Sequence, residues 1–274
     1  MANQFKIWNL ESVNLVMNLT VLGSGCSWNT ARRASAGYWL ETASGSIVLD
    51  ISASVPFRAA ETGLDWANLD AIWVSHFHLD HCGGLAPFLF GTKYAPQTQN
   101  RTKPLKICGG AGLKDLLKTF DAAGEYDLFR QPFPIEILEI APDTEFELLP
   151  NIAARSFSTP HTPESMALRL TDERGKSFVY TSDTGFDPKL GEFARAADLF
   201  VVECSYCREK AYHLHLNLAE VVELIRIAEP RETMIGHLYP EWDALPDPAE
   251  FIAAHQPINQ IIVAEDKLQH SVKS

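Results

Sequence analysis

The chain alternates short apolar runs with longer runs in which apolar residues recur at helical spacing. Residues 217–228 are the clearest example of the second kind, because leucine, valine and isoleucine recur there every three or four positions. Such a stripe packs on a core and predicts a helix; similar runs predict helices at 55–62, 85–89, 112–123 and 248–254. The short apolar runs predict strands at 18–22, 46–50, 71–75, 105–108, 135–140, 153–157, 166–170, 177–181, 199–203, 233–235 and 261–264.

This mixture of short strands and helices predicts an α/β sandwich. The β-rich stretch 135–181 does not fit a strictly alternating βαβ chain, and it indicates two sheets packed face to face with helices outside. Residues 17–274 contain no repeat or low-complexity linker, so we interpret them as one domain. Residues 1–16 precede the first core strand and are interpreted as an N-terminal extension.

Composition limits the class of partner. The chain has 274 residues, of which 46% are hydrophobic, enough for one sizeable core. Its formal net charge is −12, so it repels polyanions, and a large nucleic-acid substrate is disfavoured. A pair of bound divalent cations would reverse the sign locally, and a small anionic substrate would then be favoured.

The sequence also favours a cytoplasmic protein. No apolar stretch approaches the roughly 18 residues of a membrane span, and the first ten residues lack the layout of a secretory signal. The five scattered cysteines do not suggest a disulfide framework. Cys204 and Cys207 have zinc-knuckle spacing without a second pair, and we interpret them as the end of a strand.

The strongest chemical signal follows the predicted strand 71–75. His76, His78, Asp80 and His81 lie within six residues of one another. Burying several imidazoles together is costly unless something binds them, and neutral imidazole and carboxylate are ligands of divalent metals. Because side chains alternate along a strand, His76 and His78 can face one ion while the following turn directs Asp80 and His81 to another. The alternative is a histidine-rich surface loop.

One loop cannot surround two ions, so further ligands must come from elsewhere in the chain. His161, Asp183 and His237 each follow a predicted strand, where α/β enzymes place polar functional residues. Taken singly, each has an ordinary structural explanation, such as a surface histidine or a turn cap. Together with the cluster they predict two metal ions held by His76, His78, Asp80, His81, His161, Asp183 and His237.

These motifs, in this order, resemble the metallo-β-lactamase superfamily, and the resemblance runs from Leu22 to Asp266. It implies an αββα sandwich of two mixed β-sheets flanked by helices. It also implies that His76, His78 and His161 bind the first ion, that Asp80, His81 and His237 bind the second, and that Asp183 bridges them. Asp50 matches the buried aspartate that supports the metal loop. The implied metal is zinc, and manganese or iron are the alternatives.

Within the superfamily the chain is most similar to the ribonuclease Z-like phosphodiesterase branch. Residues 22–25, 32–35 and 49–50 follow the opening of that branch. Glu203 and His215 match a proton-handling pair beside the metals, with His213 as an alternative to His215. The resemblance also suggests a homodimer. Arg32 and Arg33 are candidates for phosphate contacts, although we favour a solvated surface position for both.

The chain departs from ribonuclease Z in two places. Residues 109–150 contain no basic, glycine- and proline-rich arm of the kind that binds tRNA in ribonuclease Z. The segment after His237 also differs from the C-terminal motif of that family. With the negative charge, these departures disfavour tRNA processing, though they do not exclude it. We therefore expect a hydrolase acting on a small phosphodiester or nucleotide-type substrate, in which metal-bound hydroxide attacks phosphorus. Asp80, Glu203 and His215 are the expected catalytic residues.

Three alternatives remain open from the sequence. The same metals could polarise a carbonyl in an acyl hydrolase, such as a lactonase, a thioesterase or a glyoxalase II-like enzyme. The chain could be a ribonuclease Z-type RNA endonuclease. It could also be a non-catalytic metal-binding scaffold, although inactive relatives usually lose ligands and all seven positions are filled here.

Overall fold

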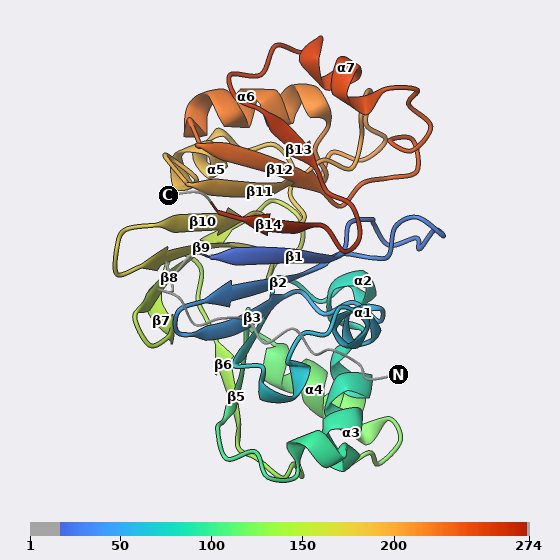
Figure 1. Ribbon diagram of the computed structural model, residues 1–274, viewed down its shortest axis with the longest axis vertical. Coiled ribbons are helices and arrows are strands. Elements are labelled where there is room, and N and C mark those ends of the chain that lie inside the picture. Colours follow the sequence, from blue (N-terminus) through green and yellow to red (C-terminus); the bar gives the residue numbers. More distant parts are fainter. Residues whose placement is uncertain (1–16, 273–274) are drawn as a thin grey trace, which may run out of the picture.

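A computed structural model describes residues 17–272, which form two sheets packed face to face between helices (Figure 1). The first sheet has the strand order β14-β1-β2-β3-β4-β5-β6, and the second has the order β13-β12-β11-β10-β9-β8-β7. The strands of the first sheet are β1 (Asn18–Gly23), β2 (Gly37–Thr42), β3 (Gly45–Leu49), β4 (Ala71–Val74), β5 (Leu105–Gly109), β6 (Ile135–Glu139) and β14 (Gln269–Ser271). Those of the second are β7 (Glu145–Leu149), β8 (Ile152–Ser158), β9 (Met166–Asp172), β10 (Ser177–Tyr180), β11 (Leu199–Glu203), β12 (Glu232–Gly236) and β13 (Ile261–Val263).

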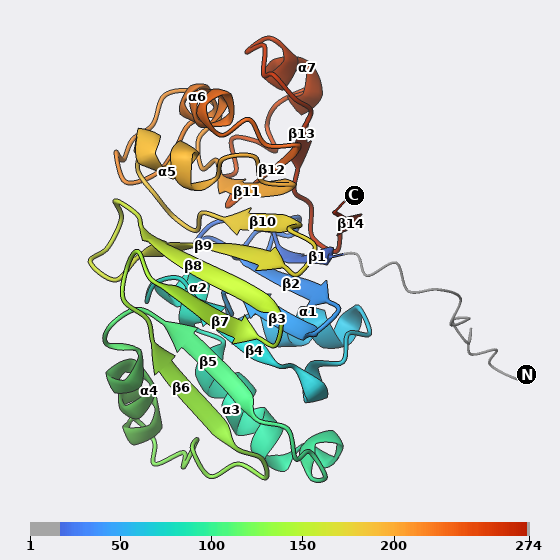
Figure 2. The same cartoon turned by 90° about the vertical axis from the view of Figure 1, so that its left-hand side faces the viewer.

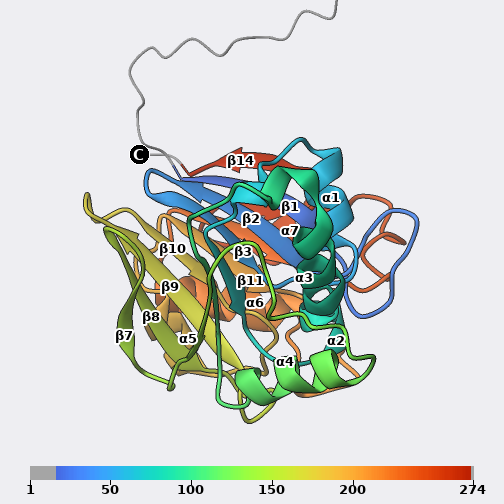
Figure 3. The same cartoon turned by 90° about the horizontal axis from the view of Figure 1, so that it is seen from below.

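Helices cover the outer faces of both sheets. They are α1 (Val55–Glu61), α2 (Leu79–Cys82), α3 (Leu85–Tyr94), α4 (Leu113–Ala122), α5 (Pro188–Phe193), α6 (Leu218–Ala228) and α7 (Pro248–Ala253), with short 3-10 turns at Trp66–Asn68 and Pro96–Thr98. Figure 3 shows strands β1–β3 between helices α1–α4 on one side and strands β7–β10 on the other. The predicted αββα sandwich is therefore confirmed.

The core consists of three apolar layers. The central layer lies between the sheets and includes Leu49, Trp73 and Phe178. A second layer joins the first sheet to α1, α3 and α4, and a third joins the second sheet to α5, α6 and α7. Burying apolar surface on both faces explains why β4 and β11 are apolar at nearly every position.

The direction of the strands brings the candidate ligands to one edge of the sandwich. Strands β3, β4, β5 and β6 run parallel, and so do β10, β11, β12 and β13. β8 has the direction of β10, because each pairs antiparallel with β9 (Figure 2). The carboxyl ends of β3, β4, β8, β10, β11 and β12 therefore carry the loops that hold the candidate site.

Several elements differ from the sequence predictions. The strands β2, β7 and β14 and the helices α2 and α5 are present without having been predicted. Polar positions interrupt β7 and β14, which are edge strands of their sheets. The predicted extension, residues 1–16, lies outside the described residues. Along residues 17–272, no helix is both long enough and apolar enough to cross a membrane.

Candidate metal centre

A buried aspartate fixes the loop that follows β4. Asp50 comes directly after β3 and is fully buried. Its carboxylate accepts hydrogen bonds of 2.7 Å from the backbone N–H and the hydroxyl of Ser75 and from the hydroxyl of Tyr180. It also lies 2.7 Å from Nδ1 of His81. Because Nδ1 is engaged in this way, the other ring nitrogen of His81 is directed into the cluster.

Three imidazoles and one carboxylate form the first group of candidate ligands. His78 Nδ1 lies 3.1 Å from Nε2 of His76 and 3.1 Å from Nε2 of His161. The carboxylate of Asp183 lies 3.8 Å from His76 Nε2 and 3.7 Å from His161 Nε2. The four residues come from the loops after β4, β8 and β10, which are far apart in the chain. Their ligand atoms nevertheless all lie within 4.8 Å of one another.

A second group shares Asp183 with the first. His81 Nε2 lies 3.3 Å from the Oδ1 atom of Asp183 and 3.4 Å from the carboxylate of Asp80. His237, which follows β12, places its Nε2 atom 3.4 Å from Asp80 and 3.3 Å from Asp183. Asp183 therefore lies between the two groups, in the position expected of a bridging ligand.

The donor atoms fit divalent metal ions. Among the described residues, His81 Nε2 and Asp183 Oδ1 are two of the four buried side-chain nitrogen and oxygen atoms that lack a hydrogen-bond partner. They face each other without hydrogen-bond geometry, and orphaned buried polar atoms are costly. A cation between them would satisfy both. Imidazole nitrogens and carboxylate oxygens are also the donors that zinc, manganese and iron accept.

The pKa values of four of these groups favour the protonation states that ligands need; the exception is His81, where burial would lower the pKa but the charges of Asp183 and Asp50 raise it well above its usual value. Burial lowers the pKa of His76 well below its usual value, and burial also lowers that of His161. Burial opposes ionisation of Asp183, but the neighbouring His237 and His81 hold its pKa well below the usual range. The pKa of Asp80 is lowered in the same way: burial would raise it, but the neighbouring His237 and His81 outweigh this effect. Neutral imidazoles and ionised carboxylates are the forms that bind metal.

Glu203 and His215 lie beside the second group. His215 Nδ1 is 2.9 Å from Oε1 of Glu203, and the His215 ring stacks on that of His237 with centroids 5.3 Å apart. Burial alone would lower the pKa of His215, but the hydrogen bond to Glu203 and the charges of Glu203 and Asp183 raise it. His213, the alternative, is exposed. The geometry thus selects His215 as the partner of Glu203.

The segment that carries His215 is held on both sides. Asn217 and Glu220 form a capping box at the start of α6, and Lys210 donates to Glu220 and to the carbonyl of His215. On the other side Gly185 approaches the backbone closely. A Cβ at this position would lie 2.6 Å from the carbonyl oxygen of His213, so only glycine allows this contact.

Three residues of the site adopt left-handed backbone conformations. The φ angles are 57° for Asp50, 56° for Ser182 and 54° for His237. Side chains other than glycine rarely adopt this region, and clusters of such residues are typical of functional sites. The conformation of His237 turns its ring from the end of β12 towards Asp80 and Asp183.

Arg33 differs from the sequence prediction. It was expected at the surface with Arg32, but only 3% of it is exposed. Its Nη1 atom donates to the hydroxyl of Ser24 at 2.9 Å and to the carbonyl of Ala264 at 2.5 Å, and its Nε atom lies 3.0 Å from Asp243. Arg33 is therefore a structural residue. Arg32, with 58% of its side chain exposed, fits the prediction.

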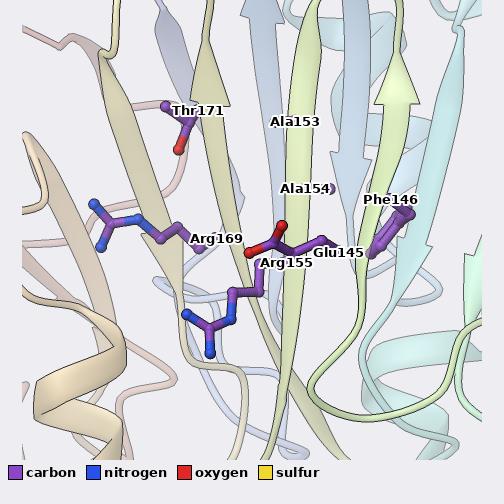
Figure 4. Close-up of a pocket in the computed structure, with 7 residues that line it drawn as sticks. All are labelled: Glu145, Phe146, Ala153, Ala154, Arg155, Arg169 and Thr171. Atoms are coloured by element: carbon purple, nitrogen blue, oxygen red, sulfur yellow. The ribbon is translucent and has the colours of Figure 1, made fainter.

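A separate pocket of about 260 Å³ lies over β7, β8 and β9 (Figure 4). The side chains of Glu145, Arg155 and Arg169 surround it. Arg169 already donates to the carbonyls of Phe193 and Arg195, which explains its position without a ligand. This pocket contains none of the candidate metal ligands.

A comparison with known protein families identifies the family of the chain. Residues 17–242 match the profile of the family described as Anti-Pycsar protein Apyc1. The chain belongs to the Apyc1 family. The matched range begins at the first residue of the predicted domain and includes all seven candidate metal ligands as well as Glu203 and His215.

Relatives place this Apyc1 family member within the metallo-β-lactamase fold. An uncharacterized protein of Mycobacterium leprae is 29% identical over 244 residues, which cover 85% of this chain and 81% of the relative. A ribonuclease Z of Ignicoccus hospitalis is 30% identical over 241 residues, covering 71% of this chain and 77% of the relative. The solved structure of the metallo-β-lactamase fold protein YhfI from Bacillus subtilis has a TM-score of 0.77 at 19% identity, covering 94% of this chain and 100% of YhfI. The predicted relationship to ribonuclease Z-like proteins is confirmed.

The Apyc1 family member thus has a metallo-hydrolase fold with His/Asp clusters suited to metal binding. The structure brings together all seven predicted ligands and places Glu203 and His215 next to them. Sequence reasoning did not identify Ser182, Ser205 or Tyr239. Ser182 donates to Ser75, and Ser205 lies 3.0 Å from His237 Nδ1. The available signal was a serine two residues after the end of a strand that leads to the site, at Ser182 after β10 and at Ser205 after β11.

We expect substitution of Asp50 by asparagine to destabilise the fold. Asparagine tolerates the left-handed backbone, so Asp50→Asn removes the charge while keeping the shape. The carboxylate holds Ser75, Tyr180 and His81, and hydrogen bonds to buried charged groups each contribute about 1.5–3 kcal/mol. The free energy of unfolding from urea titration should fall by about 3 kcal/mol or more. Asp115→Asn, at an exposed position on α4, is the control, and equal stability of both variants would contradict this role.

Proposed function

We propose that the chain is a metal-dependent phosphodiesterase that hydrolyses a small nucleotide-type phosphodiester, with a cyclic nucleotide as its substrate class. The Apyc1 family, to which it belongs, is a cyclic nucleotide-degrading phosphodiesterase family. The observation that carries the proposal is the Glu203–His215 pair, joined at 2.9 Å beside the candidate ligands. Such a pair can deliver a proton to an alkoxide leaving group, which phosphodiester cleavage requires.

The candidate ligands have distinct roles in this proposal. His76, His78 and His161 would hold one divalent ion, and Asp183 would be shared with the second. Bound divalent ions supply Lewis-acid stabilisation of the phosphate oxygens and activation of water. The same arrangement attracts an anionic substrate to a chain whose overall charge repels anions.

His215 acts as the general acid in this proposal. Its Nδ1 atom is engaged with Glu203, which leaves Nε2 as the ring nitrogen that holds and delivers a proton. Glu203 is only 3% exposed and also accepts hydrogen bonds from Thr184, Ser205 and Leu216, so its carboxylate orients the imidazole in one position. Asp80, His81 and His237 would hold the second ion, since the Asp80 carboxylate lies 3.4 Å from the Nε2 atom of each histidine.

A substrate panel tests the proposal. The zinc- or manganese-loaded protein is offered 3′,5′-cyclic nucleotides, a chromogenic phosphodiester, a homoserine lactone, a thioester and a precursor tRNA, and products are separated by chromatography. We expect cyclic nucleotides to open to nucleoside monophosphates, with one P–O bond broken and one water consumed. The chelated protein is the control. Turnover of the lactone or thioester alone would replace the proposal with an acyl hydrolase, and cleavage of tRNA alone would replace it with an RNA endonuclease.

A further inference from the structure

The loop between β1 and β2 borders the candidate metal centre. We call residues 24–34 the rim loop. Gly25 pairs with Leu238, directly after the candidate ligand His237, and the N–H of Leu238 donates to the carbonyl of Ser24 at 3.0 Å. Cys26 is fully buried; burial, together with the nearby charges of Asp80 and Asp183, raises its pKa. Figure 1 shows this loop projecting from the end of β1 on the side where α2 lies.

The base of the rim loop is fixed by polar contacts. Buried Arg33 joins it to the segment at Ala264, as described above. Asp266 accepts hydrogen bonds of 2.9 Å from the backbone N–H groups of Ser24 and Ala34, at the two ends of the loop. Inside the loop, Asn29 accepts a bond of 2.7 Å from the N–H of Ser35. The loop therefore has one preferred shape, which lowers the entropy lost when it binds a ligand.

The tip of this anchored loop presents an aromatic ring to solvent. Trp28 is 73% exposed, the largest exposed fraction among the large hydrophobic side chains of residues 17–272. It follows Gly25 by three residues, so its Cα lies within about 11 Å of the pairing with Leu238. Leu79, between two candidate ligands, and Tyr212 and Leu214, just before His215, are exposed at 69%, 66% and 49%. Exposed apolar side chains thus occur on three segments bordering the cluster.

A second aromatic wall lies deeper at the site. The rings of Tyr206 and Tyr239 stack with centroids 5.0 Å apart and an angle of 9°. The Tyr239 ring meets those of His215 and His237 edge-on, at 6.1 Å and 6.2 Å. A flat, apolar ligand group attached to a phosphate at the cluster would meet aromatic surface both here and at the rim loop.

We propose that the rim loop is the base-recognition element of the site, in which Trp28 stacks on the heteroaromatic base of the nucleotide and Tyr239 limits the inner side. This inference rests on the proposed function and names the group that the substrate carries beside its phosphodiester. The base is uncharged, so the negative chain does not repel it. Stacking on an aromatic ring tolerates different bases, so purine and pyrimidine cyclic nucleotides both bind, with the larger purines bound more tightly.

Kinetics with a substrate that lacks the base tests the assignment. Trp28→Ala, Trp28→Phe and the control Tyr94→Ala, which removes an aromatic side chain 61% exposed at the end of α3, are compared with the unmodified chain. The substrates are 3′,5′-cyclic AMP and methyl riboside 3′,5′-cyclic phosphate. We expect Trp28→Ala to raise KM for cyclic AMP by about 10-fold, with kcat nearly unchanged and the base-free substrate unaffected. Trp28→Phe should retain most of the affinity, and Tyr94→Ala all of it.

Fluorescence gives a readout independent of turnover. Trp39, Trp73 and Trp242 are each about 1% exposed or less, so acrylamide quenching reports mainly on exposed tryptophans such as Trp28. Cyclic AMP should protect the unmodified chain from quenching, and the protection should disappear in Trp28→Phe. The base-free substrate should give no protection in either protein.

The outcomes separate the two proposals. If the unmodified chain hydrolyses neither cyclic phosphate, the proposed function fails. If it hydrolyses both and Trp28→Ala raises the two KM values equally or not at all, the rim-loop inference is wrong and the function stands. If Trp28→Ala instead converts a dimer to a monomer in sedimentation, a second copy of the chain covers Trp28 and the base assignment is overturned.

Discussion

Replacing Asp183 with asparagine should abolish turnover and remove metal from the protein. Asp183 belongs to both groups of candidate ligands, and its two oxygens face His81 on one side and His76, His161 and His237 on the other. Asparagine keeps the size of the side chain but removes the negative charge that both ions would share. Loss of a residue that only orients a ligand costs about 10–100-fold in metal affinity or activity, and loss of a shared ligand should cost more.

The measurement joins metal analysis to kinetics. The unmodified chain should carry two divalent ions per chain after dialysis, and Asp183→Asn should carry at most one. The expected fall in kcat/KM exceeds about 100-fold. Asp115→Asn, whose side chain is 83% exposed on α4, should match the unmodified chain in both measurements. Full metal content together with full turnover in Asp183→Asn would show that Asp183 is not a bridging ligand.

The second large effect is expected at His215. His215→Ala should slow hydrolysis of a cyclic nucleotide by about 100- to 10,000-fold, the usual contribution of a positioned general acid. The loss should be much smaller for a p-nitrophenyl phosphodiester, because p-nitrophenolate leaves without being protonated. Metal content should not change. The ratio of the two losses therefore distinguishes a proton donor from a residue that merely supports the site.

Two further variants sharpen this experiment. Glu203→Gln should show the same dependence on the leaving group, since Glu203 holds His215 through Nδ1. His213→Ala, two residues away and exposed, should behave like the unmodified chain. Glu203, His215 and His237 also form a group close enough to hold a metal ion. If His215→Ala lost metal and slowed both substrates equally, His215 would be a ligand and not a general acid.

The sequence predicted the sandwich and the site because both depend on local patterns. Buried strands such as β11 are apolar at nearly every position, and the candidate ligands follow such strands directly. The short strand β14 has no apolar pattern, and its conformation comes from pairing with β1 at the far end of the chain. Arg33 was misplaced for the same reason, because its partners Asp243 and Ala264 lie more than 200 residues away.

The helix α5 could have been predicted. Asp187 accepts a hydrogen bond from the N–H of Lys189, and Pro188 occupies the first helical position. An aspartate followed by proline is a recognised start signal for a helix. The contact between Glu203 and His215, in contrast, required the fold. The position of His215 before a predicted helix favoured it over His213, but spacing along the chain could not establish the contact with Glu203.

The left-handed residues of the site orient the ligand side chains at a cost in folding stability. Each non-glycine residue in that region costs on the order of 1–3 kcal/mol, and Asp50, Ser182 and His237 all adopt it. Glycine would relieve the cost at each position but would delete a ligand or one of the groups that orient ligands. Substitutions that stabilise this edge of the sandwich would therefore also impair the site. Selection for a more heat-resistant protein should place its stabilising substitutions elsewhere, in the helical layers.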